Sequence, residues 1–179
     1  MSVNVKHSPF EKLQACILYA CSKDIKNEGK LDHIKLNKVL WYSDSAAYMA
    51  TGKGISDARY IRKPNGPVAR LMAPVMASLQ KDEQVKAGKQ FDPTRGMWID
   101  TYEYIGNRDG TDILTAEERE YIDNAFSGVC RHETNAISER THGEVWEIAL
   151  NGEEIPLHAM FAERVGKITS AHVAMAFGS

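Results

Sequence analysis

The feature that most constrains the fold is the stretch of residues 35–68, where a long apolar segment stops at two closely spaced glycines. Small and branched apolar residues recur at helical spacing through its first half, and Trp41 widens the apolar stripe. This pattern predicts a helix that is buried on more than one side. The helix is expected to begin near Asp32, a good N-cap, and to end at Gly52 and Gly54. We therefore expect the other elements to pack around it.

The chain after this helix predicts a strand, a turn and another helix. Residues 59–63 alternate in polarity, which is typical of a short, half-exposed strand. Residues 63–66 carry proline at the second position and glycine at the fourth, as in a β-turn. Pro67 then suits the first position of a third helix. Pro74 lies inside that helix and is expected to kink it or split it in two.

The rest of the chain predicts more helices and one small antiparallel sheet. Residues 8–11 and 115–118 each show a capping-box pattern ahead of an apolar periodicity, so a helix is expected to begin at each. Residues 84–86 and 97–105 read as the two strands of a hairpin. The predicted fold class is therefore α+β, a mainly helical single domain over residues 1–179 with a small antiparallel β-hairpin.

Composition and charge exclude several classes of protein. Apolar residues make up 43% of the 179 residues and charged residues 26%, as in soluble globular chains. The net charge is −2, which argues against a nucleic-acid partner. No apolar run reaches the roughly 20 residues of a membrane span, and no secretory signal is expected, so we predict no membrane partner and a cytoplasmic location. The unpatterned Cys16, Cys21 and Cys130 favour a reducing compartment and small core hydrophobes.

No recognised catalytic or metal-binding pattern is present. The sequence has no Gly-x-Gly-x-x-Gly, no phosphate-binding loop and no His-Glu-x-x-His, and its histidines are scattered. We therefore predict no cofactor, no metal and no catalytic residue, and thus not an enzyme; a hydrolase or transferase with a dispersed site stays an alternative. Basic residues instead gather in one loop, strand and turn, at Lys53, Arg59, Arg62, Lys63 and Arg70. They form either an ordinary solvated surface or a patch for an acidic partner.

Several ordered motifs resemble those of the Panacea antitoxin domain family, also described as SocA-like. The segment KLNKVLWYSD at 35–44 is similar to the family's "KLxKLLYFAD", GKGISDARY at 52–60 to "GxPITGxRYVA", and PNGPV at 64–68 to "PxGPV". Later motifs follow at 137–142 and in Trp146 and residues 154–156. The resemblance covers about residues 10–160 and leaves the tail of about 162–179 outside it. The family-motif residues given a structural role are Lys35, Leu36, Lys38, Leu40, Tyr42, Asp44, Pro67, Val68, Ser138, Thr141, His142 and Trp146.

The resemblance implies an antitoxin of a bacterial or phage toxin–antitoxin system. Such a protein neutralises a cognate toxin protein, encoded by the adjacent gene, through direct binding and without a cofactor. The residues that we predict to contact the toxin are Arg59, Tyr60, Arg62, Lys63, Pro64, Asn65 and Gly66. Two alternatives stay open: an adaptor that delivers a bound toxin to a protease, and a winged-helix-like nucleic-acid-binding regulator that uses the hairpin as a wing. Homo-oligomerisation also stays open.

Overall fold

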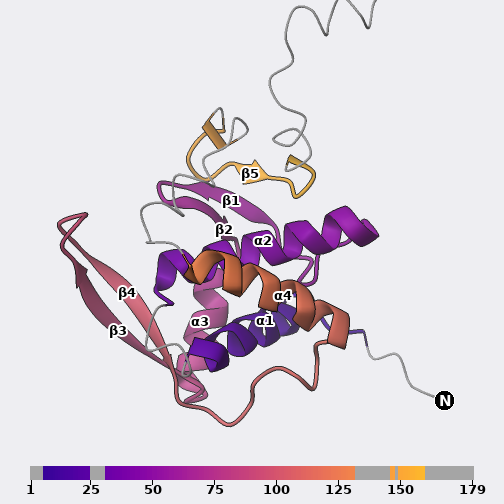
Figure 1. The fold of residues 1–179 in the computed structure, drawn as a ribbon, viewed down its shortest axis with the longest axis horizontal. Helices are drawn as coiled ribbons and strands as arrows, with labels where there is room; N and C mark the ends of the chain where they lie inside the picture. Colours follow the sequence, from indigo (N-terminus) through magenta and orange to yellow (C-terminus); the bar gives the residue numbers. More distant parts are fainter. Residues whose placement is uncertain (1–5, 25–30, 132–145, 148, 160–179) are drawn as a thin grey trace, which may run out of the picture.

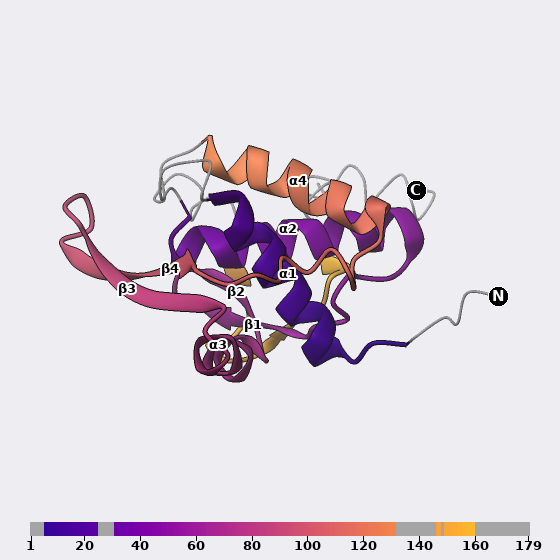
Figure 2. The ribbon, with the colours of Figure 1, turned by 90° about the horizontal axis from the view of Figure 1, so that it is seen from below.

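Helices and two small antiparallel sheets make up the structure. The computed structural model describes residues 6–24, 31–131, 146–147 and 149–159. Its helices are α1 (Pro9–Asp24), α2 (His33–Thr51), α3 (Met72–Lys81) and α4 (Ala116–Cys130). Its strands are β1 (Tyr60–Lys63), β2 (Gly66–Ala69), β3 (Val85–Asp92), β4 (Met97–Tyr104) and β5 (Glu154–Ile155). α1 and α4 pack against α2, and α3 packs against α1 (Figures 1 and 2). The predicted α+β class is confirmed.

Three of the predicted helix starts, at Ser8, Asp32 and Thr115, are confirmed by their capping contacts. At α1, the Ser8 hydroxyl accepts a hydrogen bond from the Glu11 N–H at 3.3 Å, and the Glu11 carboxylate accepts one from the Ser8 N–H at 2.8 Å. Thr115 forms the same reciprocal capping box at the start of α4. Asp32 is the N-cap of α2, and its carboxylate accepts a hydrogen bond from a backbone N–H of the first turn. Gly52 is the C-cap, with a φ of 77°. These contacts satisfy backbone groups that a helix end leaves unpaired.

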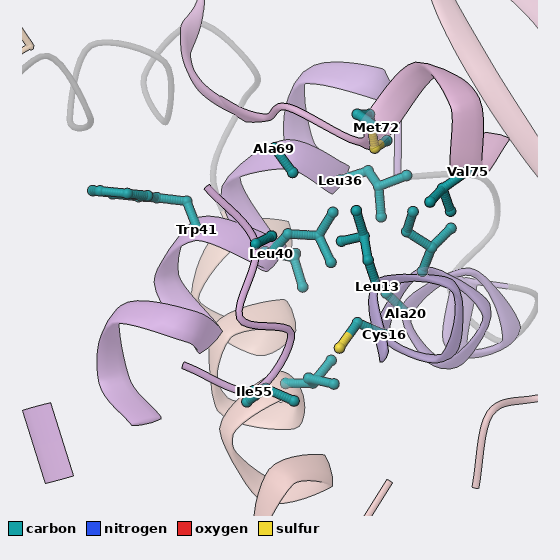
Figure 3. Close-up of a cluster of buried hydrophobic side chains, with 14 of the residues drawn as sticks. Leu13, Cys16, Ala20, Leu36, Leu40, Trp41, Ile55, Ala69, Met72 and Val75 are labelled. Carbon is teal, nitrogen blue, oxygen red and sulfur yellow. The ribbon is translucent and has the colours of Figure 1, made fainter. Parts of the chain in front are cut away.

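The core forms around α2, as its sequence predicts. Leu36, Leu40 and Ala47 are all buried. Figure 3 shows Leu36 and Leu40 facing Leu13 of α1 and Val75 of α3 within one cluster of apolar side chains. All four described helices and the strands β1, β2, β3 and β5 contribute to the whole core cluster, so α2 is enclosed on several sides. It therefore also carries the polar side chains of Lys38 and Asp44 into the interior, and these hold the neighbouring hairpin.

β1 and β2 form a hairpin where we predicted a strand, a turn and a helix. Lys63 pairs with Gly66, so Pro64 and Asn65 form a two-residue loop and the predicted turn is confirmed. The prediction that Pro67 opens a helix is wrong, because Pro67 lies in β2. The sheet order is β2-β1-β5, which makes β2 an edge strand. An edge strand tolerates proline because its outward backbone nitrogen needs no partner.

The kink or break that we predicted at Pro74 does not occur in α3. α3 begins at Met72 rather than at residue 67 and runs unbroken to Lys81. Its first helical hydrogen bond runs from the Val75 N–H to the Leu71 carbonyl, at 3.0 Å. Pro74 therefore lies in the first turn, where an N–H would have no partner within the helix. The prediction failed because it placed the helix start too early.

β3 and β4 form the predicted hairpin, but β3 is longer than expected. It spans Val85–Asp92 instead of residues 84–86 and pairs residue for residue with β4. Residues 87–90 are weak strand formers, so pairing with β4 sets the length of β3. Val85 is buried at the base of the hairpin. The distal part projects away from the helices in both Figure 1 and Figure 2.

Candidate functional site

The predicted contact residues lie on the β1–β2 hairpin and differ in exposure. Tyr60 is 1% exposed and Gly66 is buried, so the fold gives neither of them a surface for a partner. The others are exposed or, for Arg62, half-buried. We name this set the basic turn; it consists of Arg59, Arg62, Lys63, Pro64 and Asn65.

Lys38 on α2 holds the tip of this hairpin from the inside. Its exposed fraction is 0%, and its Nζ donates a hydrogen bond to the backbone carbonyl of Asn65. Burial, together with the nearby Arg95 guanidinium, lowers the pKa of Lys38 to about 7. A buried ammonium or amine requires hydrogen-bond partners, and the Asn65 carbonyl is one of them. The tip therefore stays docked on α2.

Asn65 also joins the two hairpins. Arg95, in the loop between β3 and β4, donates a hydrogen bond from Nη1 to Asn65 Oδ1 at 3.2 Å. Arg95 is itself held by Asp92, with Nε and Oδ2 3.8 Å apart and both side chains mostly buried. The carbonyl of Asn65 is thus bound to α2 and its side-chain amide to the second hairpin.

Trp146 clamps the β1–β2 hairpin beside the turn. The Arg62 guanidinium carbon lies 4.2 Å from the centroid of the Trp146 ring, a cation–π contact. Arg62 Nε donates a hydrogen bond to the Trp146 carbonyl at 2.9 Å, and Trp146 Nε1 donates one to the Lys63 carbonyl at 3.2 Å. These three contacts fix the direction of Arg62 and the backbone of Lys63.

Asp44 secures the start of β1. Its carboxylate accepts hydrogen bonds from the Ser56 N–H at 2.9 Å, the Ser56 hydroxyl at 2.5 Å and the Tyr60 hydroxyl at 2.7 Å. Asp44 is 2% exposed, and burial raises its pKa although these hydrogen bonds act in the opposite direction. The group has almost no access to solvent, so its role is to hold the segment that leads into β1.

The other family-motif residues are distributed between the core and its margin. Lys35, Leu36, Leu40 and Pro67 are buried. Tyr42, Val68 and Trp146 are partly buried and pack against the core cluster. Ser138, Thr141 and His142 lie outside the described residues, as does the predicted tail of 162–179.

Metal binding and thiol chemistry have little support in the part of the chain that the structure describes. Within it, no group of three or more His, Cys, Asp or Glu side chains could hold a metal ion. Cys16 and Cys21 are buried in the core, as predicted, and burial raises the pKa of the Cys21 thiol to about 12 and that of Cys16 well above its usual value. No helix within the described ranges has the length and apolar character to cross a bilayer.

Sequence reasoning missed an exposed apolar group on the β3–β4 hairpin. Phe91, Met97 and Trp98 are 47%, 44% and 63% exposed, and the Phe91 and Trp98 rings meet edge to face with centroids 5.5 Å apart. The available signal was the mixed face of residues 97–105, where aromatic residues alternate with an acidic one. The contact between Arg95 and Asn65 had no such signal, because each residue lies in a turn.

Comparison with known proteins supports the resemblance drawn from the motifs. Residues 36–147 match the family model described as antitoxin SocA-like, Panacea domain. The matched span is more than half of the chain, and it contains the basic turn, Lys38, Asp44 and Trp146. No curated protein and no solved structure matches the chain.

Proposed function

The chain belongs to the SocA-like Panacea antitoxin family, and from this premise we propose that it is an antitoxin that neutralises a cognate protein toxin by direct binding. The observation that carries the proposal is the family match over residues 36–147. The toxin is proposed to be the product of the adjacent reading frame. Neutralisation by binding is stoichiometric, with the domain covering the active site of the toxin or holding it in an inactive form.

The basic turn is the contact surface that we propose. Arg59 and Lys63 are exposed, and Lys38 and Trp146 hold the turn that carries them. A pre-organised turn loses little conformational entropy on binding. Arginine is also enriched among the residues that dominate interface energetics. An acidic patch on the toxin would complement this surface, and a standard interface buries about 800 Å² on each partner.

The alternative of a nucleic-acid-binding wing is not favoured by the charges of the β3–β4 hairpin. Lys86 lies opposite Glu103 in the ladder, and Lys89 lies opposite Asp100, with Nζ and Oδ1 4.0 Å apart. Acidic residues therefore offset the lysines that would have to face phosphates.

The alternative of an adaptor that delivers the toxin to a protease is supported by no feature of the described residues. Such delivery would shorten the half-life of the toxin in the presence of this protein.

Co-expression with the adjacent reading frame tests the proposal. We expect its product alone to stop growth, and this protein to restore growth and to co-purify with it. The double variant Arg59→Glu/Lys63→Glu should lose both effects, because it reverses two exposed charges without touching the core. Lys81→Glu, an exposed charge reversal at the end of α3 and outside this basic segment, is the matched control.

Two results would count against these proposals. If the wild-type protein neither restores growth nor co-purifies with the adjacent product, the antitoxin proposal is wrong. If the double variant binds as well as the wild type, the basic turn has only a structural role.

A further inference from the structure

Phe91 and Trp98, two of the exposed apolar residues near the tip of the β3–β4 hairpin, lie on the face of that hairpin which meets the core at its base. Phe91 lies opposite Trp98 in the ladder, and Val85 lies opposite Tyr104. Because side chains alternate between the two faces of a strand, all four share one face. At the base this face is covered, since Val85 is buried and Tyr104 packs against the core. At the tip it is open, with Phe91 and Trp98 about half exposed or more.

The backbone of β3 also offers an unpaired edge. In the part of the chain that is described, β3 pairs with β4 alone. The Ile105 N–H donates a hydrogen bond to the Gln84 carbonyl at 3.1 Å, so these two residues form a hydrogen-bonded pair. Hydrogen-bonded and non-hydrogen-bonded pairs alternate along the ladder from this point, which leaves residues 85, 87, 89 and 91 in non-hydrogen-bonded pairs. It follows that the N–H and C=O groups of Ala87, Lys89 and Phe91 point outward. Side chains 86–91 are exposed on both faces of the strand. Such an edge is a template for a strand from another chain.

The charges of this edge disfavour a second copy of the same chain. Lys86 and Lys89 lie along β3 and are exposed. Antiparallel pairing of two β3 strands would place the lysines of both copies along one short ladder, and like charges in neighbouring strands are destabilising. Lysines on an edge strand are a known protection against self-association. Each lysine already lies opposite an acidic residue of β4, but a strand added at the outer edge of β3 would lie next to β3 and one strand spacing further from β4. Its acidic side chains would therefore meet the lysines before the β4 carboxylates.

We propose that the β3–β4 hairpin is a second toxin-binding surface, on which an acidic strand of the toxin pairs with the outer edge of β3 and packs on Phe91 and Trp98. This inference rests on the proposed antitoxin function. Strand addition of this kind draws affinity from main-chain hydrogen bonds and specificity from side chains such as these aromatic residues. The hydrogen bond between Arg95 and Asn65 places this surface beside the basic turn, so one toxin molecule can contact both.

Binding of the purified adjacent-frame product to hairpin variants is the first test. The double variant Phe91→Ala/Trp98→Ala should raise the Kd about 30-fold or more, as expected of central aromatic anchors. Lys89→Glu should raise it about tenfold and make binding less sensitive to salt. Ile105→Ala and Leu150→Ala are matched controls, because these side chains are 50% and 75% exposed outside the proposed surface. They should leave the Kd within about twofold.

Hydrogen exchange tests the strand pairing itself. In the free protein, the amides of Ala87, Lys89 and Phe91 should exchange fast, because they point outward from the ladder. In the complex they should become protected, while the amides that already bond to β4 change little. Side-chain packing without strand addition would not protect these three amides, and that result would overturn the proposed pairing.

The remaining outcomes separate the inference from the antitoxin proposal. If the hairpin variants bind like the wild type while the basic-turn variant does not, the inference is wrong and the antitoxin function stands. If the wild type does not bind the adjacent product, both are wrong. Protection of the three amides in the free monomer, or a dimer that Phe91→Ala/Trp98→Ala abolishes, would show that this chain itself covers the edge and would overturn the toxin as its occupant.

Discussion

The β1–β2 hairpin has strands of four residues and the β3–β4 hairpin has strands of eight, yet the shorter hairpin is the one held on several sides. Lys38 binds the tip of the shorter hairpin, Asp44 binds its start, and Trp146 binds its first strand, β1. The longer hairpin packs on the helices at its base and projects from them (Figure 2). Length therefore says little about how firmly each hairpin is fixed.

The difference lies in the source of stability. A two-stranded hairpin is marginal in water by itself, so each must gain stability from elsewhere. The shorter hairpin gains it from buried polar groups that lose their partners if the hairpin detaches. The distal part of the longer hairpin has the hydrogen bond from Arg95 to Asn65 at its loop and otherwise relies on cross-strand pairs such as Phe91 with Trp98. Substitutions should consequently affect the free energy of unfolding strongly at the first hairpin and weakly at the tip of the second.

The largest effect is expected for Asp44→Ala. The substitution leaves the Ser56 N–H and hydroxyl and the Tyr60 hydroxyl without their buried acceptor. We expect the free energy of unfolding to fall by about 3 kcal/mol, measured by urea denaturation. The exposed Asp112→Ala is the control and should change it by no more than about 0.5 kcal/mol. Equal effects of the two variants would mean that the first hairpin does not depend on Asp44.

Arg62→Ala should have the next largest effect. It removes the cation–π contact with Trp146 and the hydrogen bond to the Trp146 carbonyl. The expected loss is about 1 to 2 kcal/mol in the free energy of unfolding. Arg62→Lys should restore only part of it, because the tetrahedral ammonium of lysine, unlike the planar guanidinium, cannot stack on the indole while it donates a hydrogen bond. Full rescue by lysine would show that charge alone matters at this position.

Lys38 should make stability depend on pH. Its pKa of about 7 in the folded protein lies below the ordinary value of 10.5, so between these values the unfolded chain binds one more proton than the folded one. The free energy of unfolding of the wild type, relative to Lys38→Met, should therefore rise by about 1.4 kcal/mol per pH unit above about pH 7.5. Buried tyrosines and cysteines are common to both proteins and cancel. A difference that stays flat up to about pH 9 would contradict this.

Phe91→Ala should have the smallest effect on stability. The side chain is 47% exposed, and its ring meets the Trp98 ring edge to face. We expect a loss of about 0.5 to 1 kcal/mol, measured in the same denaturation series. A loss as large as that of Asp44→Ala would show that the tip of the second hairpin is as firmly integrated as the first, and the contrast between the two would no longer hold.

Local patterns predicted those features that depend on neighbouring residues. The capping boxes at Ser8 and Thr115, the cap at Asp32 and the end of α2 at Gly52 all follow from short-range hydrogen bonds. The turn at residues 63–66 follows from the positions of its proline and glycine. The burial of α2 follows from its apolar periodicity.

Three of the failures have a common physical cause, because each depends on contacts between two segments and not on the pattern within one. Pro67 is a strand residue since β2 pairs with β1, and the proline pattern alone fits a helix start equally well. β3 extends over weak strand formers because β4 pairs with it. Tyr60 looked like a surface aromatic within a basic segment, but Asp44, on a different element, draws its hydroxyl into the core. Composition could not reveal these partners.

Asn65 has a consequence for how partners are selected. Its carbonyl is fixed to α2 through Lys38, and its side chain is fixed to the second hairpin through Arg95. A single turn residue therefore sets the distance between the basic turn and the tip of the second hairpin. If one toxin spans both tips, it must match a distance as well as a charge. Asn65→Gly would keep the backbone carbonyl that Lys38 binds and would remove the Arg95 contact, so the charged residues of the basic turn would remain while the distance between the two surfaces would no longer be fixed.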